Sequence, residues 1–150
     1  MPSKTIDHVA VVVDDLDQAL AFWRDALDIP VAHTEDNADE AVRIAFLPLG
    51  DSKIELLEPT TPDSGVAKYL AKRGPGIHHI CLAVTDIDSV MARLRDHDVE
   101  LINETPRTRP DGTRYAFVHP KSAGGVLLAD RLAGNAQAGP AAPEKKALPV

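Results

Sequence analysis

An internal repeat limits the folds open to this chain more than any other feature of its sequence. The segment IDHVAVVVDDLDQAL at residues 6–20 returns as IHHICLAVTDIDSVM at residues 77–91, with a constant offset of 71 residues. An isoleucine, a histidine and two aspartates are identical at equivalent positions, and the residues between them match in apolar character. The repeat predicts two copies of one supersecondary unit.

Each copy shows the same order of local signals. A run of β-branched and apolar residues predicts a strand, and then an aspartate, Asp15 or Asp86, precedes residues of helical periodicity, which is typical of a helix N-cap. Three shorter strands are predicted after each helix, near residues 31–33, 42–48 and 53–58 in the first copy and 100–103, 115–118 and 126–130 in the second. A further short helix is predicted at residues 66–73, between the copies.

The composition argues against several classes of protein. A formal net charge of −7 is unfavourable for a nucleic-acid partner, because binding phosphates requires a basic face. The single cysteine, Cys81, cannot form an internal disulfide. No apolar stretch approaches the ~20 residues of a membrane span, and the first residues lack a secretory signal. We therefore expect a cytoplasmic protein with neither a nucleic-acid partner nor a membrane partner.

The repeat duplicates a residue type that is well suited to metal binding. His8 and His79 take the same position on the first strand of each copy, so packing of the copies about a pseudo-twofold axis would bring both imidazoles to one cleft. Glu55 lies between apolar neighbours on the last strand of the first copy, where a solvated surface carboxylate is poorly explained. Two imidazoles and a carboxylate suit Zn²⁺, Co²⁺, Mn²⁺ or Ni²⁺ better than Ca²⁺.

The remaining candidates have simpler interpretations. A lone histidine near a strand start is more often a surface residue than a ligand, so the metal hypothesis depends on the pair and the carboxylate together. His78 is expected to pack or to contact substrate, and Cys81 to be a small buried residue rather than a nucleophile. Basic residues bracket the two copies, and a subset of them are candidates for contact with a phosphate-bearing substrate: Lys68, Lys72, Arg73, Arg107, Arg109, Arg114 and Lys121.

These observations predict an α+β fold in which tandem, paired β-α-β-β-β modules form a curved sheet around a metal cleft. We expect the modules at residues 1–64 and 77–131, with a linker helix at residues 65–76. Residues 132–150 are rich in Ala, Gly, Pro and Lys and are predicted to be a disordered tail.

Several segments together match the pattern of a known family. They are IDHVA at 6–10, AFLPLG at 45–50, IELLEP at 54–59, GIHHI at 76–80, HPKS at 119–122 and GGVL at 124–127. In these segments the chain resembles the methylmalonyl-CoA epimerases of the vicinal-oxygen-chelate superfamily, which also includes glyoxalases, bleomycin-resistance proteins and dioxygenases. The resemblance implies the paired fold and a divalent metal, often Co²⁺, Mn²⁺ or Zn²⁺, with His8, Glu55 and His79 as ligands.

The chain departs from the family pattern at the closing strand and at one turn. The family's fourth ligand, a glutamate after GGVL, falls on Ala129. Asp130 is the next residue, and we include it as a candidate ligand that a β-bulge would have to turn inward, because a one-residue shift reverses the side chain. Without a bulge, water or substrate would complete the shell. The turn at 106–112 also lacks the family's glycine-rich sequence.

The resemblance implies a metal-dependent epimerase of a 2-methylmalonyl-CoA-like acyl-CoA. A base removes the α-proton, a metal-stabilised enolate forms, and an acid returns a proton on the opposite face. Glu55, together with Glu40 or Asp39, is the candidate for these proton transfers. A homodimer is the expected assembly.

Two other functions stay open at the level of sequence. One is a glyoxalase-like isomerase or a ring-cleaving dioxygenase of the same superfamily, and a dioxygenase would use His8, His79 and Glu55 to bind iron. The other is a metal-free small-molecule binding or resistance protein that keeps the fold without the chemistry, an interpretation supported by Ala129.

Overall fold

A computed structural model describes residues 4–132 and divides them into two compact units. The first unit comprises residues 8–78, and the second comprises residues 79–132 together with residues 4–7. Both units combine strands with helices, so the predicted α+β class is confirmed. The predicted tail lies, from residue 133 onward, outside the described residues.

The first unit contains most of β1 (Lys4–Val12) and the beginning of β5 (Gly76–Val84), with six further elements between them. After β1 the chain forms a short helix that continues directly into a π-helical segment. The elements between the two long strands are α1 (Leu16–Leu20), η1 (Ala21–Ala26), β2 (His33–Asn37), β3 (Val42–Leu49), β4 (Ser52–Pro59) and α2 (Gly65–Arg73).

The second unit contains the rest of β5 and the elements that follow it. One long helix is followed by a two-residue strand, two five-residue strands and a single turn of 3₁₀-helix. These elements are α3 (Ile87–Asp96), β6 (Arg107–Thr108), β7 (Arg114–Val118), η2 (Pro120–Ser122) and β8 (Leu128–Leu132).

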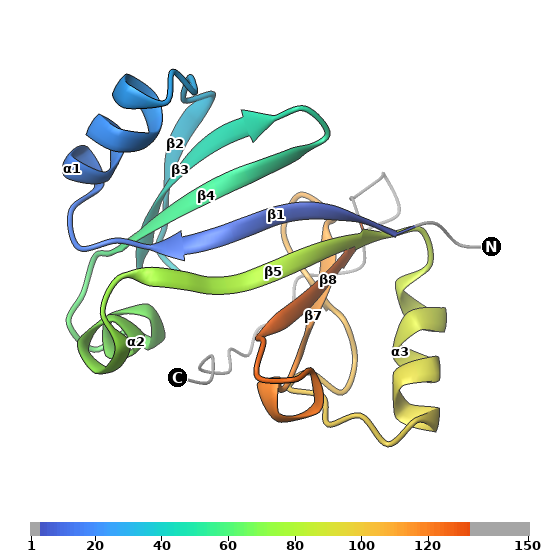
Figure 1. The fold of residues 1–150 in the computed structure, drawn as a ribbon. Helices are drawn as coiled ribbons and strands as arrows, with labels where there is room; N and C mark the ends of the chain where they lie inside the picture. The colour runs from blue at the N-terminus through green and yellow to red at the C-terminus, as the bar shows by residue number, and fades with distance from the viewer. Residues whose placement is uncertain (1–3, 133–150) are drawn as a thin grey trace. The chain divides into compact units, whose positions relative to one another are not determined.

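The strands of the two units follow the same order and the same directions. In the first unit the order is β2-β3-β4-β1, with β1 parallel to β4 and the other pairs antiparallel. In the second unit the order is β6-β7-β8-β5, with β5 parallel to β8 and the other pairs antiparallel. Figure 1 labels β2, β3, β4 and β1 of the first unit and β7, β8 and β5 of the second. The repeated sequence therefore specifies a repeated β-α-β-β-β topology.

Each face of the first unit's sheet has its own helix and its own apolar cluster. On one face, Leu16 and Leu20 of α1 pack with Leu56, together with Ala45 and Leu47. On the other face, Val66 and Tyr69 of α2 pack with a second set of strand residues, which includes Ala10, Val12, Val42, Ile44 and Leu57. The alternation of side chains along β1 and β4 produces this division.

Among the described residues of the second unit, one apolar cluster lies between α3 and the sheet. Ile87 and Met91 of α3 are fully buried against Val84, Ala116 and Val118. Leu82 and Leu128 pack at the edge of the same cluster. The other face of this sheet carries a different set of residues, which includes His79.

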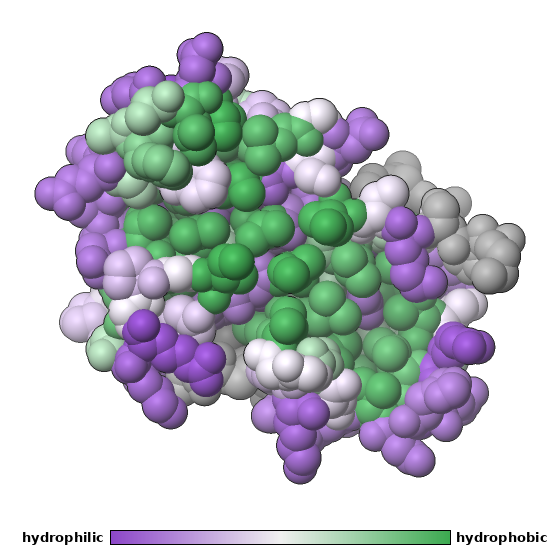
Figure 2. Space-filling model, in the orientation of Figure 1, coloured by the Kyte–Doolittle hydropathy of each residue, from purple (hydrophilic) through white to green (hydrophobic). Residues whose placement is uncertain are grey.

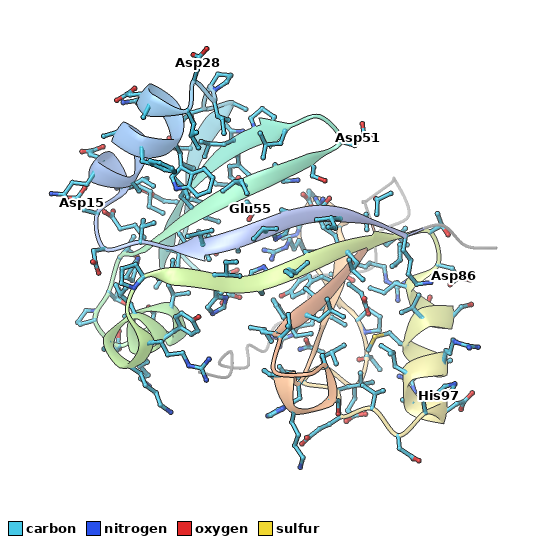
Figure 3. All side chains as sticks on the ribbon, in the orientation of Figure 1. Asp15, Asp28, Asp51, Glu55, Asp86 and His97 are labelled. Carbon is cyan, nitrogen blue, oxygen red and sulfur yellow. The ribbon has the colours of Figure 1, made fainter. Side chains whose placement is uncertain are left out.

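The repeated aspartates cap the helices as the sequence predicts. The Asp15 carboxylate accepts a hydrogen bond from the Gln18 backbone N–H at 3.1 Å, and Asp86 accepts one from Ser89 at 3.0 Å. Figure 3 labels both aspartates at the starts of their helices. Each helix also ends near an aspartate in the left-handed region, Asp28 at φ 61° and Asp98 at φ 58°.

The third element of the second module differs from the prediction. Residues 100–103 form no strand, because Leu101 makes only an isolated bridge to Val118. The edge strand β6 instead comprises Arg107 and Thr108. The strand predicted at 31–33 begins only at its last residue, His33, whereas β3, β4 and β7 match their predicted positions to within one residue at each end.

A search of the described helices finds none that is both long and apolar enough to cross a membrane.

Candidate active site

The first unit places His8 and Glu55 in contact on one face of its sheet. Ala10 of β1 is level with Glu55 of β4, and His8 precedes Ala10 by two residues, so all three side chains share a face. The His8 Nδ1 lies 3.1 Å from the Glu55 Oε2. The two residues are only 8 % and 9 % exposed, so this polar pair is withdrawn from solvent.

The surroundings of Glu55 are largely apolar. Phe46 of β3 is level with it, and the ring of His33 stacks on Phe46 with centroids 4.3 Å apart. Ala10 and Leu57 lie on the same face. In Figure 3 the Glu55 side chain projects from β4 beside β1. A low-dielectric setting of this kind strengthens the interaction of a carboxylate with a nearby cation or proton.

The structure does not bring Glu40 to this pair. Glu40 lies in the turn between β2 and β3, where its backbone N–H donates to the Asn37 Oδ1 at 3.0 Å. That turn enters β3 at Val42, four residues before Phe46, which is level with Glu55. Four strand residues span roughly 13 Å. A role for Glu40 in proton transfer stays a prediction.

His78 is buried in the first unit and packs against the linker helix. Its ring meets the edge of the Tyr69 ring at a centroid distance of 4.8 Å, and the Tyr69 hydroxyl donates to the Ile77 carbonyl at 2.6 Å. Burial lowers the pKa of His78 to about 4, so the imidazole is neutral at pH 7. The packing interpretation of His78 fits this position.

In the second unit His79 is buried on the sheet face that α3 does not cover. Its ring meets the edge of Phe117 at 5.4 Å, and Phe117 is level with Ala129, which is level with Cys81. These residues therefore share one face. Cys81 is 2 % exposed, as expected for a small buried residue.

The register shows that Asp130 points away from His79, so its assignment as a metal ligand is corrected. Asp130 is level with Leu82 and with Ala116, which belong to the cluster beneath α3. The pairing of β8 is continuous on both sides from Leu128 onward, and no extra residue interrupts it. The β-bulge that would turn Asp130 inward is thus missing, and the face of His79 receives Ala129 instead.

Asp130 is a buried carboxyl group in apolar surroundings. The residue is 2 % exposed, and its Oδ2 has no hydrogen-bond partner among the described residues. Desolvation raises the pKa of Asp130 from 3.8 to about 6, although the charge of Lys4 acts in the opposite direction. A carboxyl group of this kind lowers stability when ionised and takes no part in the His8–Glu55 pair.

Arg131 lies on the same face of the sheet as His79, and the sequence did not mark it as a site residue. Arg131 is level with Tyr115, two residues from Phe117 on β7. Its guanidinium donates to the Asp7 carboxylate at 2.8 Å within the second unit. No local motif marks the residue, because its position depends on the register of β8 and on a partner 124 residues away in sequence.

The donor atoms present suit a divalent ion. The carboxylate of Glu55 and the imidazole of His8 are a hard and a borderline donor, buried and already within 3.1 Å of each other. His79 offers a second buried imidazole in the other unit. The His8–Glu55 pair therefore fits the divalent ion that the sequence predicts.

The sequence and the fold agree with one family. The model of the Glyoxalase/Bleomycin resistance protein/Dioxygenase superfamily matches residues 7–117 of the chain. The chain belongs to this superfamily.

Within that superfamily the chain is similar to known epimerases. It is 35 % identical to the human mitochondrial methylmalonyl-CoA epimerase over 82 % of this chain and 70 % of that one. It is 36 % identical to the ethylmalonyl-CoA/methylmalonyl-CoA epimerase of Cereibacter sphaeroides, over 82 % of this chain and 93 % of that one.

A solved structure extends the similarity to the fold. A variant of the Streptomyces coelicolor methylmalonyl-CoA epimerase, in complex with 2-nitronate-propionyl-CoA, superposes with a TM-score of 0.78 at 39 % identity, over 87 % of this chain and 97 % of that one. The predicted resemblance to methylmalonyl-CoA epimerases is confirmed, and with it the expectation of an isomerase.

Proposed function

We propose that the protein is a metal-dependent epimerase of a 2-methylmalonyl-CoA-like acyl-CoA. The observation that carries the proposal is the buried pair of His8 and Glu55, whose Nδ1 and Oε2 atoms are 3.1 Å apart. The apolar side chains of Ala10 and Phe46 lie beside Glu55 on the same face of the sheet. The epimerases among the relatives, and the acyl-CoA analogue in the complex of one of them, support the choice of substrate class.

His8 and Glu55 would hold the divalent ion, with His79 as the third ligand that the sequence predicts. When bound, such an ion supplies Lewis-acid polarisation of the thioester carbonyl, which acidifies the neighbouring α-carbon. The imidazole of His8 orients the Glu55 carboxylate, because its Nδ1 and the Oε2 are within hydrogen-bonding distance. The apolar side chains around Glu55 limit the access of water to the acidified carbon.

Inversion at the α-carbon requires proton transfer on two opposite faces of the substrate. Glu55 is the candidate on one face, because its carboxylate is buried in apolar surroundings and its Oε2 lies 3.1 Å from the His8 Nδ1. For the other face we predict Glu40 as the proton-transfer group. Glu40 reaches the substrate only if the turn between β2 and β3 moves toward Glu55.

The metal site is tested by the metal content of purified variants. We expect about one equivalent of a divalent ion per chain in the wild type, and a small fraction of that in His8→Ala, Glu55→Ala and His79→Ala, since each removes a ligand. His33→Ala is the matched control, because this imidazole lies on the same sheet face as Glu55 but its side chain is 58 % exposed.

Thermal melting of each variant shows whether it is folded. Full metal content in all three ligand variants would contradict the site, and loss of metal in His33→Ala as well would show that the effect is not specific. The kind of metal also separates this proposal from the alternatives within the superfamily. Redox-active iron would favour a dioxygenase, and the lack of any ion would favour a binding protein.

A homodimer is the assembly we propose, from the family resemblance alone. Large apolar side chains exposed in the first unit include Phe22, within η1, and Leu27, directly after it. Figure 2 shows hydrophobic atoms gathered over this helical segment. Light scattering of the purified protein measures the mass directly, and a monomer at micromolar concentration would contradict the assignment.

A further inference from the structure

Tyr115 lies between two arginines across the strands of the second unit. It is level with Arg107 of β6 on one side and with Arg131 of β8 on the other. Residues that face each other in a strand pair place their side chains on the same face of the sheet. Arg107 and Arg131 therefore flank the phenol ring from both sides, in a chain whose net charge is −7.

A third guanidinium covers the ring itself. The Cζ of Arg109 lies 4.4 Å from the centroid of the Tyr115 ring, a cation–π contact that limits the motion of this long side chain. The Arg131 guanidinium donates a hydrogen bond to the Asp7 carboxylate at 2.8 Å, which holds its position. Backbone and side-chain hydrogen bonds with Thr113 are the main causes of the lowered pKa of Asp111, and the charges of Arg131 and Arg109 lower it further. The Asp111 carboxylate therefore lies within electrostatic range of both guanidinium groups.

The positive charges of the arginine cluster, which consists of Arg107, Arg109 and Arg131, exceed the negative charges of the neighbouring carboxylates. Arg107, Arg109 and Arg131 carry three positive charges, against the two negative charges of Asp7 and Asp111. The remaining positive charge is carried by guanidinium groups, whose planar forks match carboxylate and phosphate oxygens. The Tyr115 hydroxyl is a further donor at the centre of the cluster.

The arginine cluster lies on the same sheet face as His79. Phe117 connects the two, because its ring meets His79 at 5.4 Å and Tyr115 at 6.1 Å. Arg131 is level with Ala83, four residues beyond His79 on β5, which corresponds to roughly 13 Å along the strand. A group bound by the arginines is therefore several bonds away from any group bound at His79.

We infer that Arg107, Arg109 and Arg131 form a subsite for a second anionic group of the acyl-CoA substrate, remote from the thioester. The inference rests on the proposed function for the identity of the substrate. The ligand is a phosphate of the CoA moiety, because the carboxylate of a methylmalonyl group is only two bonds from the thioester carbonyl carbon and is therefore not remote from it. Ala129, two residues before Arg131 on β8, is uncharged. No carboxylate at that position therefore repels a bound anion.

The test compares epimerisation of a methylmalonyl thioester of CoA with that of the same thioester of pantetheine, which lacks every phosphate. The variants are Arg107→Gln, Arg109→Gln and Arg131→Lys, the last of which keeps the charge beside Asp7. Arg114→Gln is the matched control, because Arg114 precedes Tyr115 on β7 but pairs with Asp88 of α3 on the opposite face. Thermal melts confirm that each variant is folded.

If the bound group is a phosphate, the Gln variants raise KM for the CoA thioester by on the order of 3–10-fold at unchanged kcat, and leave the pantetheine thioester unaffected. An equal rise of KM for both thioesters would overturn the inference, because the pantetheine thioester carries no phosphate. Arg131→Lys retains most of the wild-type KM. Gln variants that match Arg114→Gln with both substrates would overturn the inference and leave the proposed function standing.

Calorimetric binding of free CoA separates the subsite from the reaction. An enzyme that turns over neither thioester, but binds CoA more weakly by a similar factor in the Gln variants, would support the subsite and overturn the proposed function. A wild type that turns over neither thioester and binds CoA no better than Arg107→Gln does would overturn both.

Discussion

Asp130 is a carboxyl group in a position that an apolar side chain would fill at lower free energy. Its pKa is raised from 3.8 to about 6, so between these values the folded protein binds a proton that the unfolded chain has already released. The free energy of unfolding contributed by this group therefore falls as the pH rises through that window. Above pH 6 the ionised form is buried beside Leu82 and Ala116.

Asp130→Asn removes this ionisation at nearly constant volume. We expect the variant to gain stability over the wild type at pH 8, by on the order of 2 kcal/mol, and to gain little or nothing at pH 4, where the wild-type carboxyl is protonated. Urea unfolding at both pH values measures the difference. An equal change at the two pH values would show that ionisation of Asp130 is not the cause.

The residues of the candidate site differ in how far the sequence predicted them. His8 and Glu55 follow from the repeat and from an acidic residue in an apolar strand, and the structure brings them into contact. Asp130 could not be assigned from sequence, because its direction depends on whether β8 is regular or bulged. Arg131 was missed because its partner, Asp7, is remote in the chain.

The helices of the two units begin with the same capping interaction, and so they offer a paired test at the scale of an element. Asp15 and Asp86 each accept a backbone hydrogen bond from the residue three positions later. Asp86 also accepts one from the Ser89 hydroxyl at 2.7 Å.

Replacing either cap by alanine leaves the first turn of the helix without its acceptor. We expect Asp15→Ala and Asp86→Ala each to lower the free energy of unfolding by about 1 kcal/mol, with the larger loss in Asp86→Ala. Chemical denaturation monitored by circular dichroism measures both. Asp63→Ala is a control at an aspartate just before the Ser64 cap of α2, and a loss as large there would contradict a specific capping effect.

The elements best predicted from sequence are those with a strong local pattern. The first strand and helix of each copy have β-branched runs and aspartate caps, and they form where expected. The strand expected at residues 100–103 has no comparable pattern. Its residues hydrogen-bond to Phe117 and His119 but form only an isolated bridge, at Leu101. The edge position is filled by Arg107 and Thr108, whose pairing with β7 is a tertiary feature.

At the scale of the whole molecule, the duplicated sequence produces two units with the same strand order. Each unit contributes a buried histidine from its first strand, His8 in one and His79 in the other. The first unit adds the carboxylate of Glu55, and the second adds the arginine cluster around Tyr115. The halves have thus diverged in the chemistry on their sheets, while their topology has been kept.

The proposed epimerisation depends on abstraction of a proton from the α-carbon of the substrate, and this step requires Glu55. The most direct measurement is the uptake of deuterium at that carbon from D₂O, followed by proton NMR on methylmalonyl-CoA. We expect rapid exchange with the metal-loaded wild type, and a rate lower by on the order of 10²–10³-fold with Glu55→Gln. The control Glu35→Gln, at an exposed carboxylate of β2, should exchange at the wild-type rate. Exchange by Glu55→Gln at the wild-type rate would contradict the role of Glu55, and no exchange by the metal-loaded wild type would contradict the proposed epimerisation.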